Sequence, residues 1–267
     1  MTNSYKQNKP QVMGIINITP DSFFEGSRCE TKDAILSRVE QFKAEGATIF
    51  DIGACSTRPG SAPVSEEEEL SRMGSALKTI RGVYPDICLS IDTFRASVAR
   101  MAGKEYGAQI INDVYGSDPA MAKTVAELGC TYIYTHPFEV DSSSPNELIR
   151  KIFAFFADGI QSLRKEGVDQ IIIDPGFGFG KTMDQNFELF SLMHELKSLG
   201  HPILVGISRK RMIWQTLGIT PDEALNGTTA LNTMALAEGA DILRVHDVKE
   251  AVQCVELFTR CYKKKKV

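Results

Sequence analysis

One short unit recurs along this chain and restricts what the chain can fold into. A run of β-branched and other apolar residues ends in a polar residue and leads into a stretch with helical periodicity. Because these runs lack the alternation of a half-exposed strand, they predict strands of a parallel sheet covered on both faces. The unit occurs eight times, with runs at Val12–Ile18, Thr48–Ile52, Ile87–Ile91, Gln109–Val114, Thr131–Tyr134, Ile171–Ile173, Ile203–Ile207 and Asp241–Val245.

Amphipathic stretches separate these runs and predict helices. Examples are Thr31–Glu45, Ser65–Val83, Asn146–Glu166 and Asp222–Glu238. Ser65 followed by Glu68 predicts a capping box at the start of one helix. A glycine just before the next strand marks the end of several others, at Gly46, Gly129, Gly167, Gly200 and Gly239.

The number of units favours a closed barrel. Eight units in 267 residues average about 33 residues each, close to the roughly 250-residue α/β fold known as the (β/α)₈ or TIM barrel. No linker rich in Pro, Gly or Ser divides the chain. We therefore predict a single domain over residues 1–267, with a core from about 12 to 258 between a polar N-terminal tail and a Lys-rich C-terminal tail. A doubly wound open sheet is the alternative, because a local pattern does not establish closure.

Charge and composition exclude several classes of partner. The net charge of −4 argues against a nucleic-acid-binding face, which needs a basic surplus. No run of residues is long and apolar enough for a membrane span, and the polar start lacks the core of a signal peptide. The six cysteines form no C-x-x-C motif and are expected to be reduced thiols, so we expect a cytoplasmic protein.

Polar residues follow the predicted strands where a barrel carries its chemistry, at the C-terminal ends. They are Asn17, Asp51, Asp92, Asn112 with Asp113, His136, Asp174, Ser208, and Arg244 with His246. Strands seven and eight of this fold commonly supply a phosphate site, so Arg244 and His246 are candidates for binding an anion. Ser208–Arg211 is a second candidate, because it opens a helix and carries cations.

The loops after the other strands extend this prediction. The segment from Asp174 to Thr182 is not a Walker A loop, since only three residues separate Gly176 from Gly180. Its aromatic residues Phe177 and Phe179 are predicted to stack on a flat ring. Long irregular loops after the first two strands are predicted lids. Taken alone, the residues predict a site for a small anion, with a planar polar ring held by carboxylates and an amide.

The motifs resemble those of one family, the dihydropteroate synthases, in order from about residue 12 to 250. They are Met13–Phe23 (MGIINITPDSF), Ser56–Gly60 (STRPG), Asp174–Lys181 (DPGFGFGK), Ser208–Lys210 (SRK) and Arg244–Asp247 (RVHD). The resemblance implies a (β/α)₈ barrel, usually a homodimer, that acts in folate synthesis and is inhibited by sulfonamides. It also implies a transferase that joins 6-hydroxymethyl-7,8-dihydropterin diphosphate to 4-aminobenzoate and releases diphosphate with Mg²⁺.

The resemblance also implies a role for each matched residue. Asp92, Asn112, Asp174 and Lys210 would hold the pterin ring, and Asn17, Arg244 and His246 the diphosphate, with Asn17 also a ligand of Mg²⁺. Thr57, Arg58 and Pro59 would form a lid, while Ser208, Phe179 and Pro59 would line the aminobenzoate pocket. Asp92 and an acidic lid with Asp21 and Glu25 would stabilise a cationic methylene group, so Asp92, Lys210, Arg58 and Asp21 are the predicted catalytic residues.

One segment departs from the family, and two other functions compete. After the fifth strand the usual Met-His-Met reads Thr135-His136-Pro137, which puts the packing beneath the pterin in question. A methyltetrahydrofolate-dependent methyltransferase would share the pterin-holding barrel but has no need of the anion site at Arg244 and His246. A catalytically inactive relative that binds pterin or regulates a partner is the other alternative.

Overall fold

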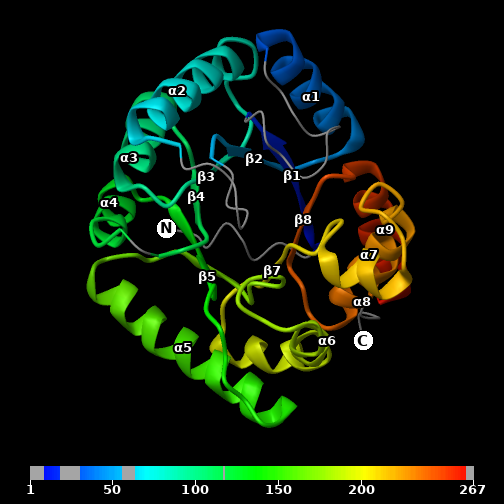
Figure 1. Cartoon of the computed structure of the whole chain (residues 1–267). Coiled ribbons are helices and arrows are strands. Elements are labelled where there is room, and N and C mark those ends of the chain that lie inside the picture. The colour runs from blue at the N-terminus through cyan, green and yellow to red at the C-terminus, as the bar shows by residue number, and fades with distance from the viewer. Residues whose placement is uncertain (1–8, 19–30, 56–63, 117, 263–267) are drawn as a thin grey trace, which may run out of the picture.

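Parallel strands form a barrel that is surrounded by helices (Figure 1). The computed structural model describes residues 9–18, 31–55, 64–116 and 118–262. The strands are β1 (Gln11–Asn17), β2 (Ile49–Gly53), β3 (Leu89–Asp92), β4 (Ile110–Asp113), β5 (Thr131–Thr135), β6 (Ile171–Asp174), β7 (Leu204–Val205) and β8 (Ile242–Val245). Every predicted apolar run thus overlaps a strand, with ends that differ by a few residues.

The order of the strands distinguishes the barrel from the open sheet. Hydrogen-bonded neighbours run β6-β5-β4-β3-β2-β1-β8-β7, and each pair is parallel. An additional bridge joins Ile173 of β6 to Ile203 just before β7, and the Ile173 N–H donates to the Pro202 carbonyl oxygen at 2.9 Å. This bridge brings the two ends of the sheet together, so the barrel is nearly closed. The predicted barrel is confirmed, and the doubly wound alternative is wrong.

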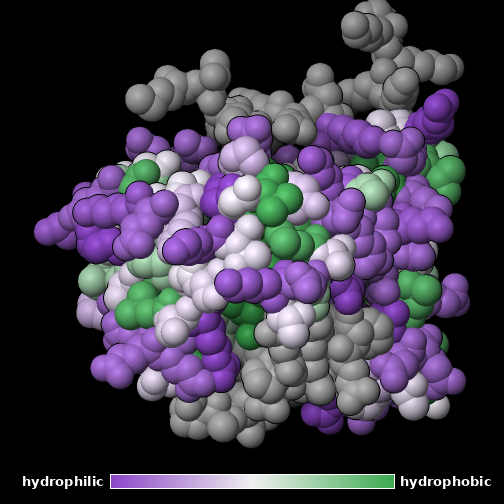
Figure 2. All heavy atoms as spheres, turned by 90° about the horizontal axis from the view of Figure 1, so that it is seen from above, coloured by the Kyte–Doolittle hydropathy of each residue, from purple (hydrophilic) through white to green (hydrophobic). Residues whose placement is uncertain are grey.

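The helices lie outside the strands, as Figure 1 shows. They are α1 (Lys32–Glu45), α2 (Glu66–Val83), α3 (Ala96–Tyr106), α4 (Met121–Leu128), α5 (Pro145–Lys165), α6 (Met183–Leu192) followed by the 3₁₀ helix η2 (Met193–Leu199), α7 (Arg211–Leu217), α8 (Leu225–Ala237) and α9 (Val248–Cys261). The face over α1 and α2 is mainly hydrophilic (Figure 2). No helix among the described residues is long and apolar enough to cross a bilayer.

Local signals set most helix ends as predicted. The five closing glycines all have positive φ, the left-handed conformation that glycine adopts without strain. The capping box at Ser65 forms only in part: the Ser65 hydroxyl accepts the Glu68 N–H at 3.2 Å, but the Glu68 carboxylate pairs with Arg72. A complete capping box occurs instead at the start of α6, between Thr182 and Gln185.

Two apolar layers hold the barrel together. The interior is filled by one side chain from most strands, namely Met13, Ile49, Ile110, Ile133, Ile172, Leu204 and Ile242. The larger layer packs the outward-facing side chains of the strands against the helices. Phe177 belongs to this outer layer: it is fully buried, and its ring centroid lies 5.8 Å from that of Phe190. The prediction that Phe177 stacks on a ligand is therefore wrong, because the loop after β6 turns this ring into the core.

Candidate functional site

The inward-facing positions change from apolar to polar along each strand toward its C-terminal end. Side chains on one face of a strand recur every second residue. Three polar side chains come two residues after an apolar side chain of the barrel interior and therefore face inward as well. They are Asp51 after Ile49 on β2, Asp174 after Ile172 on β6, and Arg244 after Ile242 on β8. The strand register places these ends at one level of the barrel. The predicted strand-end residues are therefore gathered at one mouth.

A buried ion-pair network occupies the side of the mouth formed by β2, β3 and β8. Arg244 Nε donates to Asp51 Oδ2 and Arg244 Nη2 donates to Asp92 Oδ2, both at 2.6 Å. Asp51 also accepts bonds from the Ser90 hydroxyl at 2.6 Å and from Asn112 Nδ2 at 3.1 Å. Burial raises the pKa of Asp92 above its usual value, although Arg244 acts in the opposite direction. Asp92, Asn112 and Arg244 thus come together as predicted.

Asp51 is the centre of this network, and the sequence analysis assigned it no role. Its side chain is fully buried and accepts bonds from residues of three other strands, the adjacent β3 and the more distant β4 and β8. Its position at the end of its strand indicated a place at the mouth, because it lies two residues after an inward apolar residue, as Asp174 and Arg244 do. A carboxylate at that position is enclosed and must be paired with a cation or hydrogen-bonded.

Asp174 and Lys210 lie on the other side of the mouth. Asp174 Oδ1 accepts the Gly176 N–H at 2.8 Å. Lys210 Nζ donates to the Phe177 carbonyl oxygen and lies 4.5 Å from the centroid of the Phe179 ring. Burial lowers the pKa of Lys210 to about 8, although Asp174 acts to raise it. Burial also raises the pKa of Asp174, and the Lys210 cation acts against this effect. Asp174 and Lys210 are thus close enough for each to affect the pKa of the other, and their role in holding the pterin stays a prediction.

Ser208 and His246 are joined between the ends of β7 and β8. The Ser208 hydroxyl lies 3.1 Å from His246 Nδ1 and accepts the His246 backbone N–H at 3.2 Å. Burial, together with the nearby Arg244 cation, lowers the pKa of His246 to about 3, so its imidazole is neutral at pH 7. Arg209 ties the same two loops together through two bonds to the Asp247 carboxylate, at 2.8 and 2.9 Å.

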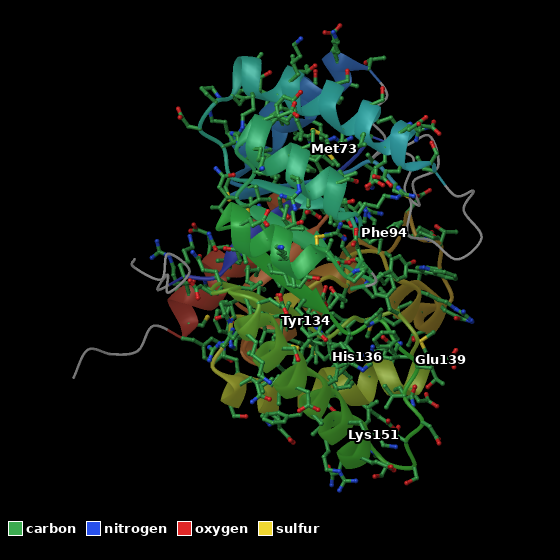
Figure 3. The ribbon with its side chains drawn as sticks, turned by 90° about the vertical axis from the view of Figure 1, so that its left-hand side faces the viewer. Met73, Phe94, Tyr134, His136, Glu139 and Lys151 are labelled. Atoms are coloured by element: carbon green, nitrogen blue, oxygen red, sulfur yellow. The ribbon has the colours of Figure 1, made fainter. Side chains whose placement is uncertain are left out.

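A lysine holds the loop after β6 against the end of β5. Lys181 Nζ donates to the carbonyl oxygens of His136, Gly176 and Phe179 at 3.0–3.1 Å and lies 3.2 Å from His136 Nδ1. Burial lowers the pKa of Lys181 to about 7. Burial and the Lys181 charge lower the pKa of His136 to about 4. Figure 3 shows His136 following Tyr134 toward the edge of the barrel where Phe94 lies.

Asn17 and Asp92 each direct a side-chain oxygen toward Gly53 at the end of β2. A Cβ atom added at Gly53 would lie 3.5 Å from Asn17 Oδ1 and 3.7 Å from Asp92 Oδ2, so both oxygens border the space above Gly53. Amide and carboxylate oxygens suit Mg²⁺, which commonly keeps several waters and shares substrate phosphates. The described residues contain no group of three His, Cys, Asp or Glu side chains around one point. The donors present therefore fit Mg²⁺ held jointly with a phosphate-bearing substrate.

Four predicted site residues, Asp21, Thr57, Arg58 and Pro59, lie outside the described residues, as does Glu25. The described chain shows only how the segment after residue 63 is anchored. Arg95 Nη2 donates to the Val64 carbonyl oxygen at 2.6 Å, and Arg95 Nη1 pairs with the buried carboxylate of Glu69. Glu69 also accepts the Thr93 hydroxyl at 2.6 Å. Val64, the first described residue after the predicted second lid, is thereby tied to α2 and to the end of β3.

Comparisons with known proteins agree with this geometry. Residues 13–246 match the family model described as pterin binding enzyme. The curated dihydropteroate synthase of Bacillus subtilis is 38% identical over 259 residues, covering 96% of this chain and 89% of the relative. A crystal structure of dihydropteroate synthase from Clostridium difficile with pteroic acid matches with a TM-score of 0.89 at 36% identity, over 96% of this chain and 98% of that one. The Yersinia pestis enzyme with a sulfonamide drug matches with a TM-score of 0.88 at 35% identity, over 98% and 96%.

Proposed function

The chain belongs to the pterin-binding enzyme family, as a transferase of the dihydropteroate synthase type in folate synthesis, and from this premise we propose its reaction. The enzyme condenses 6-hydroxymethyl-7,8-dihydropterin diphosphate with 4-aminobenzoate to give 7,8-dihydropteroate and diphosphate. The observation that carries this proposal is the gathering of Asp92, Asn112, Asp174, Lys210 and Arg244 at one mouth of the barrel.

The carboxylate, amide and lysine groups recognise the pterin ring. Asp174 is a hydrogen-bond acceptor suited to the N–H and NH₂ donors of a pterin edge, and Lys210 is a donor beside it. Asn112 carries both kinds of group, and its Nδ2 is already directed to Asp51. Each charge-assisted bond of this kind contributes about 1.5–3 kcal/mol. The ring is thus held by groups that the strands position before it binds.

Arg244 and His246 bind the diphosphate. A guanidinium carries five N–H donors, and the bonds to Asp51 and Asp92 use two of them, which leaves donors for phosphate oxygens. His246 is a neutral donor or acceptor, since burial and Arg244 lower its pKa to about 3. Asn17 would hold Mg²⁺ together with the phosphates, and this ion supplies neutralisation of charge on the leaving group when it is bound.

The chemical step is a substitution that proceeds through a cation-like methylene group. The bond from the methylene carbon to the diphosphate oxygen breaks, and its electron pair leaves with the diphosphate. The amine of 4-aminobenzoate forms the new C–N bond and loses one proton. The Asp92 carboxylate would stabilise the positive charge that spreads into the ring, so the protein would act by positioning and electrostatics. Asp21, Arg58 and the lid residues Thr57 and Pro59 stay predictions, as do Ser208 and Phe179 in the aminobenzoate pocket.

We also propose a homodimer in the cytoplasm that binds sulfonamides at the aminobenzoate pocket. The sulfonamide part is supported by the Yersinia pestis relative, which was crystallised with a sulfonamide drug, whereas the dimer and the cytoplasmic location follow from the family resemblance. Sedimentation velocity of the purified chain tests the dimer.

The reaction is tested by incubating labelled 4-aminobenzoate with the pterin diphosphate, with and without Mg²⁺. We expect labelled dihydropteroate to form only when Mg²⁺ is present. Folded protein that makes no product in either condition would contradict the proposal and favour the pterin-binding inactive relative.

The control is Asp174→Asn. This change keeps the size of the side chain and the acceptor for the Gly176 N–H but removes the charge. We expect it to abolish pterin binding in calorimetry while the protein stays folded. Unchanged pterin affinity would remove Asp174 from the site.

A further inference from the structure

One buried hydroxyl at the mouth stands apart from its polar neighbours. Thr135 is 2% exposed, and within the described part of the chain its Oγ1 has no hydrogen-bond partner. Asp51 and Asp174, at the ends of nearby strands, both accept bonds. A buried hydroxyl without a partner costs free energy that a methyl group of the same size would not. Among the described residues, this oxygen therefore makes no stabilising hydrogen bond in the ligand-free state.

The alternation of β5 places this hydroxyl on the inner side of the barrel. Ile133 belongs to the apolar interior, whereas the ring of Tyr134 stacks outside on Phe155 of α5, with centroids 4.9 Å apart. Thr135 is two residues after Ile133 and so faces inward. Its register partner on the adjacent strand β6 is Asp174. On the other side, Asn112 of β4 pairs in register with Ile133, the inward-facing residue that precedes Thr135 on β5. Thr135 thus lies beside the carboxylate that the proposed function assigns to the pterin.

The chemistry of this pair differs from that of either group alone. An ionised carboxylate only accepts hydrogen bonds, whereas a threonine hydroxyl both donates and accepts. Asp174 and Thr135 side by side can therefore hold a ring edge on which an N–H donor adjoins an acceptor. A pterin has such an edge, with ring nitrogens and a carbonyl oxygen next to its N–H groups. A benzoate ring carries no such pattern.

We propose that Thr135 Oγ1 donates a hydrogen bond to the pterin heterocycle next to Asp174 and selects for an acceptor at that point of the ring. This inference rests on the proposed function. Asp174 is 9% exposed and Thr135 only 2%, so the ring meets the carboxylate first and the more deeply enclosed hydroxyl gains a partner when the ring is seated. A site that offers a hydrogen bond to one substrate group discriminates against analogues that lack the group.

The test compares Thr135→Val, which keeps the shape and removes the hydroxyl, with Thr135→Ser, which keeps the hydroxyl. Calorimetry with 6-hydroxymethylpterin measures the Kd of each. We expect Thr135→Val to weaken binding by about five- to tenfold, the size of one lost hydrogen bond, and Thr135→Ser to restore it to within about twofold. The KM for 4-aminobenzoate should stay within about twofold in both variants. Thr135→Ala gives a second way to remove the hydroxyl if the valine variant does not fold.

Thermal unfolding of the ligand-free proteins provides a second measurement, in which stability should rise although pterin affinity falls. Removal of an unpartnered buried hydroxyl should raise Tm in Thr135→Val, although pterin binding weakens. Ser97 on α3 is a matched control, because its Oγ is also buried with no partner among the described residues. Ser97→Ala should raise Tm without changing the Kd for the pterin.

The outcomes separate this inference from the proposed function. If wild type and Thr135→Val bind 6-hydroxymethylpterin with the same Kd, the role of Thr135 is overturned and the proposed function is not affected. Wild-type protein that does not bind the pterin at all overturns both. A Thr135→Val variant that loses pterin affinity and 4-aminobenzoate affinity to the same extent also overturns the inference, because a selective contact to the heterocycle would not act on both substrates.

Discussion

The two sides of the barrel mouth hold their buried cations in different ways. On the side of β2, β3 and β8, Arg244 is paired with the carboxylates of Asp51 and Asp92. On the side of β5 and β6, Lys181 is held by three carbonyl oxygens and lies beside the His136 ring. Arg244 is thus hydrogen-bonded to negatively charged carboxylates, whereas Lys181 is hydrogen-bonded to neutral backbone carbonyl groups.

This difference affects how firmly each side keeps its charge. Against the effect of burial, Asp51 and Asp92 hold the pKa of Arg244 above its usual value. Burial lowers the pKa of Lys181 to about 7, although the nearby Asp174 carboxylate acts to raise it. The first side is therefore a fixed charge array for the diphosphate. The second side carries the Asp174 carboxylate for the ring, and the buried Lys181 bridges the loop after β6 to the end of β5.

The largest expected effect comes from removing the charge at the centre of the ion-pair side. Asp51→Asn leaves Arg244 with one carboxylate partner and places a second amide beside Asn112. Because Arg244 then keeps only one of the two carboxylates that compensate its buried charge, we expect a loss of about 3 kcal/mol in unfolding free energy, the lower end of the range for a broken buried pair. Urea unfolding of the ligand-free protein measures it.

A matched control at the same network is Ser90→Ala, which removes one neutral donor from Asp51 and should cost about 1 kcal/mol. If Asp51→Asn costs no more than Ser90→Ala, the network is not held by charge, and the contrast between the two sides disappears.

The next effect concerns the dipole-held side. Lys181→Met keeps the length of the side chain but leaves three carbonyl oxygens without their donor. We expect a loss of about 1–3 kcal/mol, smaller than for Asp51→Asn, because the buried ammonium itself carries a desolvation cost. Urea unfolding at pH 7 measures it, and the exposed Lys78→Met should change stability by less than about 0.5 kcal/mol. A loss as large as that of Asp51→Asn would show that both sides are equally charge-dependent.

The same variant gives a pH dependence of defined sign. The pKa of Lys181 is about 7 in the folded chain, against 10.5 for an ordinary lysine. Between these values the unfolded chain binds the extra proton, so the contribution of Lys181 to stability rises with pH. The stability difference between wild type and Lys181→Met should therefore be larger at pH 9.5 than at pH 6.5. A constant difference would mean that the pKa of Lys181 is not lowered.

The smallest effect is a shift in the titration of His136. Burial and the Lys181 charge lower its pKa to about 4, so the ring should stay neutral above pH 5. NMR of the imidazole carbon-bound protons follows the titration. In Lys181→Met the pKa of His136 should rise while remaining below 6.5, because burial persists. A wild-type pKa of 6.5 would place His136 in contact with solvent.

Much of this architecture could be predicted from the sequence because strands and helix ends depend mainly on residues close together in the chain. Continuous apolar runs predicted the strands, and closing glycines marked helix ends. Phe177 was misassigned because a glycine-rich loop does not disclose which of its aromatic rings turns inward. The capping box at Ser65 was incomplete because the Glu68 carboxylate has a competing partner in Arg72 one turn later.

The sequence by itself determined the repeated unit, the polar residue at the end of each strand and the family to which the motifs point. Only the tertiary structure decided how those residues share their charges. The bond from Arg244 to Asp51 joins residues 193 positions apart, and whether a buried hydroxyl such as that of Thr135 has a partner depends on neighbours from other strands. The local sequence pattern specifies which polar side chain stands at the end of each strand. Their ion pairs and their burial depend on neighbouring strands and are therefore set only by the closed barrel.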